Sequence, residues 1–228
     1  MARRAVRVVL FDRAAEFTDA VEACLARLGV RAALPAHVTV ETCGGCDVRG
    51  LARRLGAEGA QGVAYVSPAN SAGWMDGGLD AVYCEMFPGV QERVQASIRR
   101  VGLRTAGGRA YLPVGSALTV RLPCGSSLVC APTMFRPADV SRTRHAYRAG
   151  VAALAAFLRS LEAPGSAPAV LACPALCCGY GCMPPAASAA QVCEALRDVL
   201  ALGRVPPAVR MAADPLYYVA EDHDELVT

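Results

Sequence analysis

Short apolar runs and longer stretches of helical period alternate along the chain. The short runs, each bounded by turn residues, predict strands over 6–11, 37–41, 62–67, 110–114, 117–122, 128–131 and 169–173. Stretches in which apolar residues recur every three or four positions predict helices over 14–28, 48–55, 78–101, 137–161 and 186–200. Gly115-Ser116, between two apolar runs, indicates a hairpin or a bulged strand. We therefore expect a layered α/β protein with a central mixed sheet.

The periodic pattern continues to residue 203 and fades beyond it. A chain of 228 residues with 54% apolar content can bury one large core, so we expect a single domain over 1–203. The remainder, 204–228, contains Pro206-Pro207, the pair Tyr217-Tyr218 and an acidic end. This composition predicts a C-terminal extension that is either partly docked through its aromatic residues or flexible.

Charge and cysteine content narrow the class of protein. The net charge is only +3 and the arginines are spread along the chain, so we expect no nucleic-acid partner. Residues 1–4 lead directly into the first strand, too soon for a signal peptide or a membrane span. We expect a cytoplasmic protein, with access to the nucleus left open, and no membrane partner. Eleven cysteines then indicate reduced thiols instead of a disulfide framework.

Asn70 is the only asparagine of the chain, and it lies just after the strand expected over 62–67. Its uncharged carboxamide can both donate and accept, so it can hold two neighbouring hydroxyls such as those of a ribose. The simpler interpretation is an asparagine that caps a turn. We favour the ribose because Gly73, Gly77 and Gly78 follow, and glycines allow backbone N–H groups to approach a ligand at a helix start.

Two carboxylates are expected at the starts of helices. Asp80 falls in the first turn of the helix expected from residue 78, where the positive helix end should keep it ionised. It can stabilise the helix there, or it can orient a water. Asp47 follows Cys43-Gly44-Gly45-Cys46 and can either cap the next helix or accept a hydrogen bond from a purine amino group. Both roles of Asp47 need the same oxygens.

Two further segments follow predicted strands, and ligands of open α/β sheets bind at strand carboxyl ends. After the strand over 128–131 comes the helix expected over 137–161, which we expect Asp139 or Ser141 to cap, and for His145 we favour a structural role. After the strand over 169–173, Gly179 and Gly181 form a nest of backbone donors suited to a diphosphate. Tyr180 lies between them and can pack against a sugar.

Together these motifs resemble the macro domain family of ADP-ribose-binding modules. Residues 63–80, with Ser-Pro-Ala-Asn-Ser and Met-Asp-Gly-Gly, are similar to the family's strand, asparagine turn and glycine-rich first loop. Residues 174–181 are similar to its second, phosphate-holding loop, and 112–115 and 131–134 add to the likeness, which spans 6–200. The resemblance implies that Asn70 binds the distal ribose, that Asp47 reaches adenine and that Asp80 corresponds to the acidic residue implicated in hydrolysis.

The resemblance thus implies an α/β fold, the three-layer α/β/α macro domain fold with a central mixed sheet, and a complete site. Its catalytic residues would be Asp80 and Asn70, with no metal and no cofactor. Its ligand-binding residues would be Asp47, Val48, Ala69, Asn70, Gly77, Gly78, Cys177, Cys178, Gly179, Tyr180 and Gly181. The expected partner is ADP-ribose or an ADP-ribosylated protein. The expected reaction is hydrolysis of an ADP-ribosyl linkage on proteins or of ADP-ribose 1″-phosphate, and the alternative is a non-catalytic reader of ADP-ribose.

The chain departs from the family pattern in both loops. Cys177-Cys178 stands where most relatives carry Ser-Thr or Gly-Thr, so a weaker thiol contact replaces any hydroxyl contact to phosphate. The second loop is one residue shorter than the common form. Asp76 stands where many members have a third glycine, which adds a negative charge near a phosphate site. These departures keep a third hypothesis open, a scaffold that has lost its ligand.

A zinc site and a dinucleotide-binding oxidoreductase are less favoured. Cys43 and Cys46 could converge with Cys178 and Cys182 as four zinc thiolates, but such a cage would fill the ligand cleft. A dinucleotide oxidoreductase would need Gly-x-Gly-x-x-Gly to open a helix after the first strand, and this chain lacks that motif.

Overall fold

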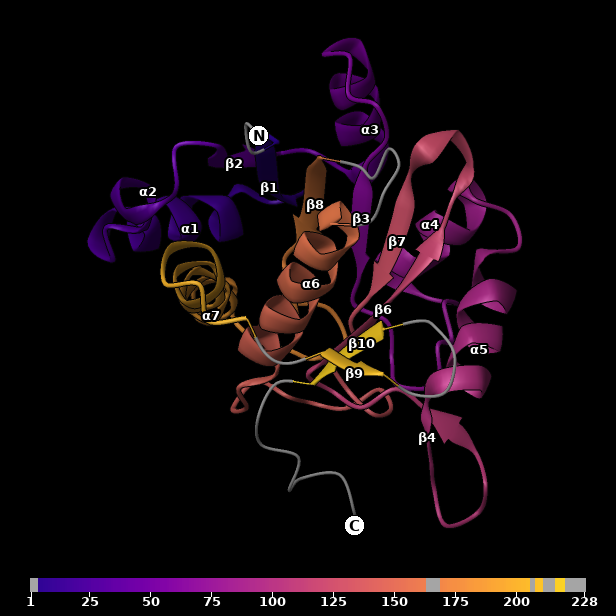
Figure 1. The fold of residues 1–228 in the computed structure, drawn as a ribbon. Helices are drawn as coiled ribbons and strands as arrows, with labels where there is room; N and C mark the ends of the chain where they lie inside the picture. The colour runs from indigo at the N-terminus through magenta and orange to yellow at the C-terminus, as the bar shows by residue number, and fades with distance from the viewer. Residues whose placement is uncertain (1–3, 163–168, 206–207, 211–215, 220–228) are drawn as a thin grey trace.

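A mixed sheet lies at the centre of the computed structural model, which describes residues 4–162, 169–205, 208–210 and 216–219 (Figure 1). The strand order is β2-β1-β8-β3-β7-β6-β10-β9. The strands β2, β1, β8, β3 and β7 are mutually parallel. The strands β6, β10 and β9 follow in the sheet, and each is antiparallel to the strand before it. The strands are β1 (Val6–Asp12), β2 (Val38–Gly44), β3 (Ala64–Ser67), β6 (Ser116–Arg121), β7 (Ser127–Cys130), β8 (Val170–Pro174), β9 (Ala208–Arg210) and β10 (Leu216–Val219).

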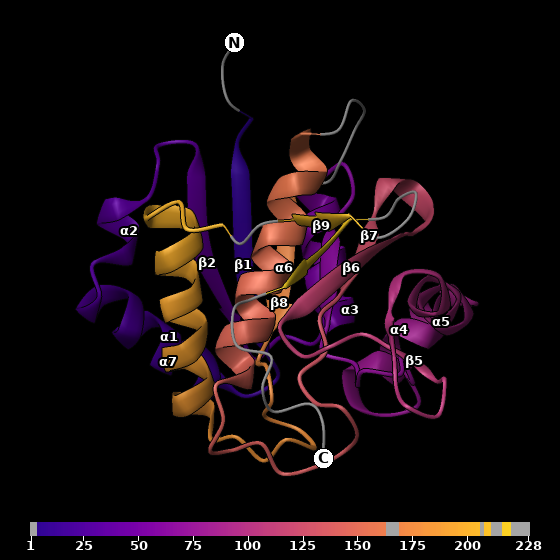
Figure 2. The same ribbon diagram turned by 60° about the horizontal axis from the view of Figure 1, so that its bottom comes forward.

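Helices cover both faces of this sheet (Figures 1 and 2). One core cluster joins the sheet to α1 (Ala15–Arg27), α6 (His145–Glu162) and α7 (Pro185–Leu196). The other joins it to α3 (Val48–Ala57), α4 (Gly78–Met86) and α5 (Val90–Val101). Val8 and Leu10 enter the first core and Val9 and Phe11 the second, because successive strand residues point to opposite faces. The α/β class and the three-layer arrangement with a mixed sheet are confirmed.

Two expected helices are shorter than the apolar pattern predicts. The helix expected over 78–101 is divided into α4 and α5, because Pro88 lacks an N–H donor and Gly89 adopts a left-handed φ of 78°. The helix expected over 137–161 begins only at His145. Asp139 instead accepts the N–H of Ser141 at 2.8 Å in a preceding turn, and Thr143 Oγ1 accepts the N–H of His145 at 3.2 Å. The expectation that Asp139 or Ser141 caps this helix is therefore wrong.

The hairpin expected at Gly115-Ser116 is also absent from the described structure. Only Ala110–Tyr111 of the strand expected over 110–114 forms (β5), and it pairs with Leu103–Arg104 (β4) in a separate ribbon. Pro113 has no N–H to give to a ladder, and its carbonyl accepts both the N–H and the hydroxyl of Ser116, at 3.1 and 2.6 Å. These bonds form a tight turn that directs the chain into β6. A short helix, α2 (Val30–Ala33), follows α1 and was not predicted.

Part of the segment after residue 203 belongs to the sheet. β10 pairs with β6, and β9 pairs with β10. The predicted division of the chain at residue 203 stays a prediction. Pro206-Pro207, the acidic end and the side chains of Tyr217-Tyr218 lie outside what the structure describes. Among the helices that are described, none has the length and apolar character needed to cross a membrane.

Candidate functional site

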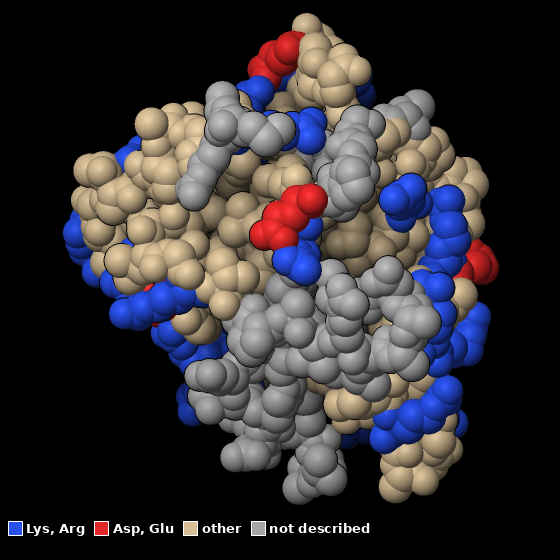
Figure 3. Space-filling view, viewed as in Figure 1, with Lys and Arg blue, Asp and Glu red and all other residues tan. Residues whose placement is uncertain are grey.

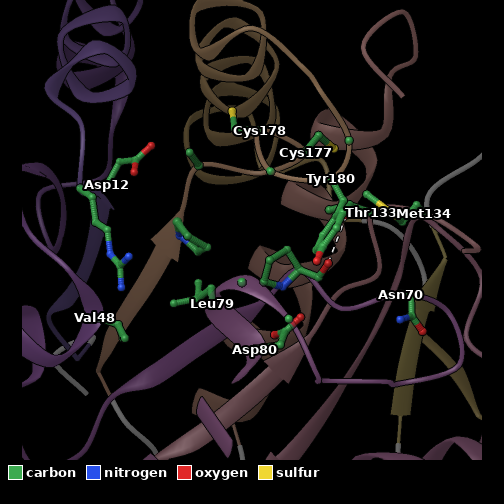
Figure 4. Close-up of a pocket in the computed structure, with 18 of the residues that line it drawn as sticks. Asp12, Val48, Asn70, Leu79, Asp80, Thr133, Met134, Cys177, Cys178 and Tyr180 are labelled. Carbon is green, nitrogen blue, oxygen red and sulfur yellow. Dashed lines mark hydrogen bonds between the residues drawn. The ribbon is translucent and has the colours of Figure 1, made fainter. Parts of the chain in front are cut away.

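A cleft of about 730 Å³ opens at the carboxyl ends of the parallel strands (Figure 4). Segments that follow β1, β2, β3, β7 and β8 line it, as expected for a ligand site in an α/β sheet. Of the predicted site residues only Ala69 does not line the cleft. The predicted residues that do line it are Asp47, Val48, Asn70, Gly77, Gly78, Asp80, Cys177, Cys178, Gly179, Tyr180 and Gly181.

Asn70 holds the first loop together. Its Oδ1 accepts the N–H of Ala72 at 3.1 Å and the N–H of Trp74 at 3.3 Å, and its Nδ2 donates to the Trp74 carbonyl at 3.2 Å. These bonds agree with the simpler interpretation of Asn70 as an asparagine that caps a turn. A carboxamide has two N–H donors and two acceptor lone pairs, so one N–H remains for a ligand. Asn70 can donate to a ribose hydroxyl, but its oxygen is already engaged twice.

Neighbouring backbone bonds anchor the same loop to the segment after β7. Ser71 N–H donates to the Met134 carbonyl at 2.9 Å, and Thr133 N–H donates to the Ala69 carbonyl at 3.3 Å. The Thr133 hydroxyl also donates to the Pro68 carbonyl at 3.1 Å. His145 Nδ1 lies 2.9 Å from the Thr133 carbonyl, and this contact assigns His145 a positioning role for the segment.

Asp80 is a buried acid on α4 with an unusual proton affinity. Only 8% of it is exposed, and Ser67 Oγ donates to its Oδ1 at 2.6 Å. Burial raises the pKa of Asp80 to about 7, Ser67 opposes the rise, and the negative charge of Asp76 adds to it. The expectation that Asp80 stays ionised is not met at neutral pH, because desolvation raises its pKa to about 7 and leaves about half of the carboxyl groups protonated. A group that titrates near neutral pH can accept and return a proton.

The two glycine loops meet across the cleft. A Cβ atom on Gly77 would lie 3.1 Å from Tyr180 Cε2 and 3.2 Å from its hydroxyl oxygen, so the aromatic ring lies directly over this glycine. Tyr180 is nevertheless 68% exposed. The next residue, Gly78, has a φ of 56°, which places the first residue of α4 in the left-handed region. The start of α4 and the second loop therefore enclose one space from two sides.

The second loop has its own backbone constraints. Cys177 adopts a φ of 65°, rare for a residue with a side chain, and its carbonyl accepts the N–H of Met183 at 3.0 Å. A Cβ on Gly181 would lie 2.5 Å from that carbonyl oxygen and 2.8 Å from Val140 Cγ2. A Cβ on Gly179 would meet nothing within 4 Å. Gly181 is thus the glycine that this loop requires for close approach.

The thiols of Cys177 and Cys178 are protonated and at least partly buried. Burial raises the pKa of Cys177 to about 12, and burial also raises that of Cys178. They can offer a phosphate only weak S–H donors.

The purine end of the predicted site is formed by Asp47 and its neighbours. Asp47 is the N-cap of α3, and its Oδ1 accepts the N–H of Gly50 at 2.7 Å. The predicted cap is confirmed, and the carboxylate keeps lone pairs on both oxygens for a purine amino group. Cys46 also lines the cleft. Its pKa is raised to about 11, mainly by burial and to a smaller extent by the neighbouring Cys43 thiol.

Some cleft residues were not predicted. Asp12 and Arg13 line it at the end of β1, and Trp74, Asp76 and Pro137 line it elsewhere. The rule that ligands bind beyond strand carboxyl ends would have found Asp12 and Arg13, since they follow the first apolar run. Trp74 is 55% exposed, an uncommon position for a large aromatic side chain.

The metal alternative gains no support within the part of the chain that the structure describes. No group of three or more His, Cys, Asp or Glu residues there is arranged to hold a metal ion.

Comparisons with known proteins give no information about the site. No protein-family model matches this chain, and no curated protein matches it significantly.

Proposed function

We propose that the cleft binds ADP-ribose and that the protein hydrolyses ADP-ribosyl linkages on proteins or ADP-ribose 1″-phosphate. The observation that carries this proposal is the contact of the two glycine loops, with Tyr180 over Gly77, at the start of α4. Backbone N–H groups at a helix start favour anions, and a loop that faces them can close around a diphosphate. A cavity of about 730 Å³ is within the range of small-molecule sites.

The polar groups of the cleft suit a diphosphate held mainly by the backbone. Arg13 is the one basic side chain among the described lining residues, whereas Asp12, Asp47, Asp76 and Asp80 are acidic. Side-chain charge would repel a polyphosphate here, so N–H groups and the helix field must provide most of the attraction. One remaining N–H of Asn70 would then donate to the ribose.

In the hydrolytic step Asp80 acts as general base. Its ionised carboxylate takes a proton from a water, the water oxygen forms a bond to the electrophilic atom of the linkage, and the bond to the leaving group breaks. The leaving group takes the electron pair. A base with a pKa of about 7 is half ionised near neutral pH, as efficient proton transfer requires.

Calorimetric titration with ADP-ribose tests the binding proposal. Gly78→Val is the test variant, because valine strains a left-handed backbone at the start of α4. Gly59→Val is its matched control. Gly59 also has a positive φ, 80°, and open space around its Cβ, but it lies beyond the end of α3 and does not line the cleft. We expect binding by wild type and by Gly59→Val and its loss in Gly78→Val. Absence of binding by the wild type would favour a scaffold.

Catalysis is tested with wild type and Asp80→Asn on ADP-ribosylated protein and on ADP-ribose 1″-phosphate. Loss of the general base should lower the rate ~10²–10⁴-fold, while affinity for ADP-ribose is retained. The second candidate function is a non-catalytic reader, favoured by the protonated fraction of Asp80 and the thiols at Cys177-Cys178. A wild type that binds tightly and releases no product from either substrate would establish the reader. A cytoplasmic location stays a prediction.

A further inference from the structure

A second hollow of about 310 Å³ adjoins the cleft. Asn70, Trp74 and Pro137 line both spaces, so the hollow begins at the proposed ribose end. Its other walls come from the loop after β3, the β4–β5 ribbon and the segment after β7. These are Ala72, Thr105, Arg109, Ala110, Tyr111, Phe135 and Arg136.

The hollow presents aromatic rings to solvent. Trp74 is 55% exposed and Phe135 is 42% exposed. Tyr111 packs its ring against Phe135 with centroids 5.4 Å apart and planes at 74°. Rings at this angle form a corner and not a parallel slot, so they suit the stems of peptide side chains better than a sandwiched base.

The charge around the hollow is positive. Arg109 and Arg136 are exposed, and neither guanidinium forms an ion pair with any residue that the structure describes. Among the residues that the structure describes, those that line the hollow include no Asp or Glu. Arg99, Arg100 and Arg104 are exposed nearby in sequence, and Figure 3 shows basic side chains along the edge over α5 and β4. These arginines favour an anionic partner, because a guanidinium can donate two parallel hydrogen bonds to one carboxylate.

We infer that this hollow and its arginines bind an acidic peptide segment that flanks the modified residue of an ADP-ribosylated protein. The inference rests on the proposed function, since it assigns the protein side of that substrate. The ribose carries the linkage, and the hollow adjoins the ribose end, so the chain beyond the linkage would pass over Trp74 toward Arg109 and Arg136. Basic side chains gather along the edge over α5 and β4 (Figure 3), which fits several carboxylates in series.

Binding of two ADP-ribosyl peptides, one with Asp and Glu flanks and one with Ser and Gly flanks, tests this inference. Affinity is measured by fluorescence anisotropy in Asp80→Asn, which limits turnover. The acidic peptide should bind roughly three- to thirtyfold more tightly, the range for two partly exposed ion pairs. The difference should shrink as salt increases. Arg109→Ser combined with Arg136→Ser should abolish it and leave the affinity for free ADP-ribose unchanged.

The matched control removes two other exposed arginines, Arg53→Ser with Arg121→Ser, which line neither space. This variant should keep the preference for acidic flanks. Equal affinity for both peptides, with normal binding of free ADP-ribose, overturns the inference and leaves the proposed function intact. An arginine-dependent gain for a chain of two ADP-ribose units, without one for the acidic peptide, would identify a nucleotide as the occupant and also overturn it. No binding of free ADP-ribose contradicts the proposed function instead.

Discussion

Ser67 at the end of β3 donates a 2.6 Å hydrogen bond to the buried carboxylate of Asp80 on α4. The bond joins the sheet to the helix that forms one wall of the cleft. It also holds down the pKa of an acid that burial alone would raise further. Because the same carboxylate is the proposed general base, its ionisation links the stability of the fold to the chemistry of the site.

Asp80→Asn should stabilise the protein more at pH 8 than at pH 4. The pKa of Asp80 is about 7 in the fold and 3.8 in the unfolded chain, so the folded state holds the proton more tightly. The resulting stability is present below pH 4 and is lost as pH rises through 7. Asparagine keeps an acceptor for Ser67 and never ionises. Chemical denaturation should show a gain on the order of 3–4 kcal/mol at pH 8 relative to pH 4.

Ser67→Ala provides the companion measurement to this prediction. It removes the hydrogen bond that lowers the pKa of Asp80, so the loss of stability should shift to higher pH. A gain in Asp80→Asn that is equal at both pH values would mean that Asp80 titrates normally in the fold.

Variants of Asn70 should separate its loop contacts from its ligand contact. Asn70→Ala leaves the N–H groups of Ala72 and Trp74 unpaired and should lower both stability and ADP-ribose affinity by roughly 1–3 kcal/mol. Asn70→Asp keeps an acceptor for those N–H groups but cannot donate. It should retain more stability than Asn70→Ala and still lose affinity. Thermal denaturation measures the stability of each variant, and calorimetry measures its affinity for ADP-ribose. Wild-type affinity in Asn70→Asp would show that Asn70 makes no contact with the ribose.

The two glycines of the second loop should respond differently to alanine. At Gly181 the added Cβ would overlap the Cys177 carbonyl and Val140, so Gly181→Ala should destabilise the protein by roughly 1–3 kcal/mol. At Gly179 the Cβ has open space, so Gly179→Ala should change stability by less than about 0.5 kcal/mol. Denaturation curves of the pair test this. Similar losses in both variants would show that the loop does not have the described conformation.

Gly77 and Tyr180 should act as a coupled pair in ligand binding. Gly77→Ala places a methyl group against the Tyr180 ring, which is exposed and must move. We expect weaker ADP-ribose binding with little loss of stability. In a Tyr180→Ala background the same change should matter less, with a coupling of about 0.5–3 kcal/mol in a double-mutant cycle. Simple additivity would mean that the ring does not lie over Gly77 when the ligand binds.

The sequence pattern predicted the layered fold because burial on both sheet faces imposes it locally. The residues from Val6 to Phe11 are almost continuously apolar, as expected for a strand covered by helices on both sides. Glycine loops after strands predicted the cleft for the same reason, since parallel strands bring their carboxyl ends to one edge. Helix boundaries were less well predicted, because Pro88-Gly89 interrupts a pattern whose apolar period continues on both sides.

The amino-acid sequence by itself determined most strands and helices of the layered fold, although not α2, β4, β9 or β10, and it predicted that the loops at residues 70–80 and 174–184 face one cleft. Only the tertiary structure decided the proton affinity of Asp80, which depends on how completely surrounding groups exclude water. It alone showed that Asn70 has one N–H left, because only the conformation of the loop shows which of its own neighbours, Ala72 and Trp74, the carboxamide contacts. The arginine-lined hollow is also visible only in the tertiary structure. Trp74, Arg109 and Arg136 lie far apart in the sequence and come together through packing, which no periodic pattern of the chain predicts.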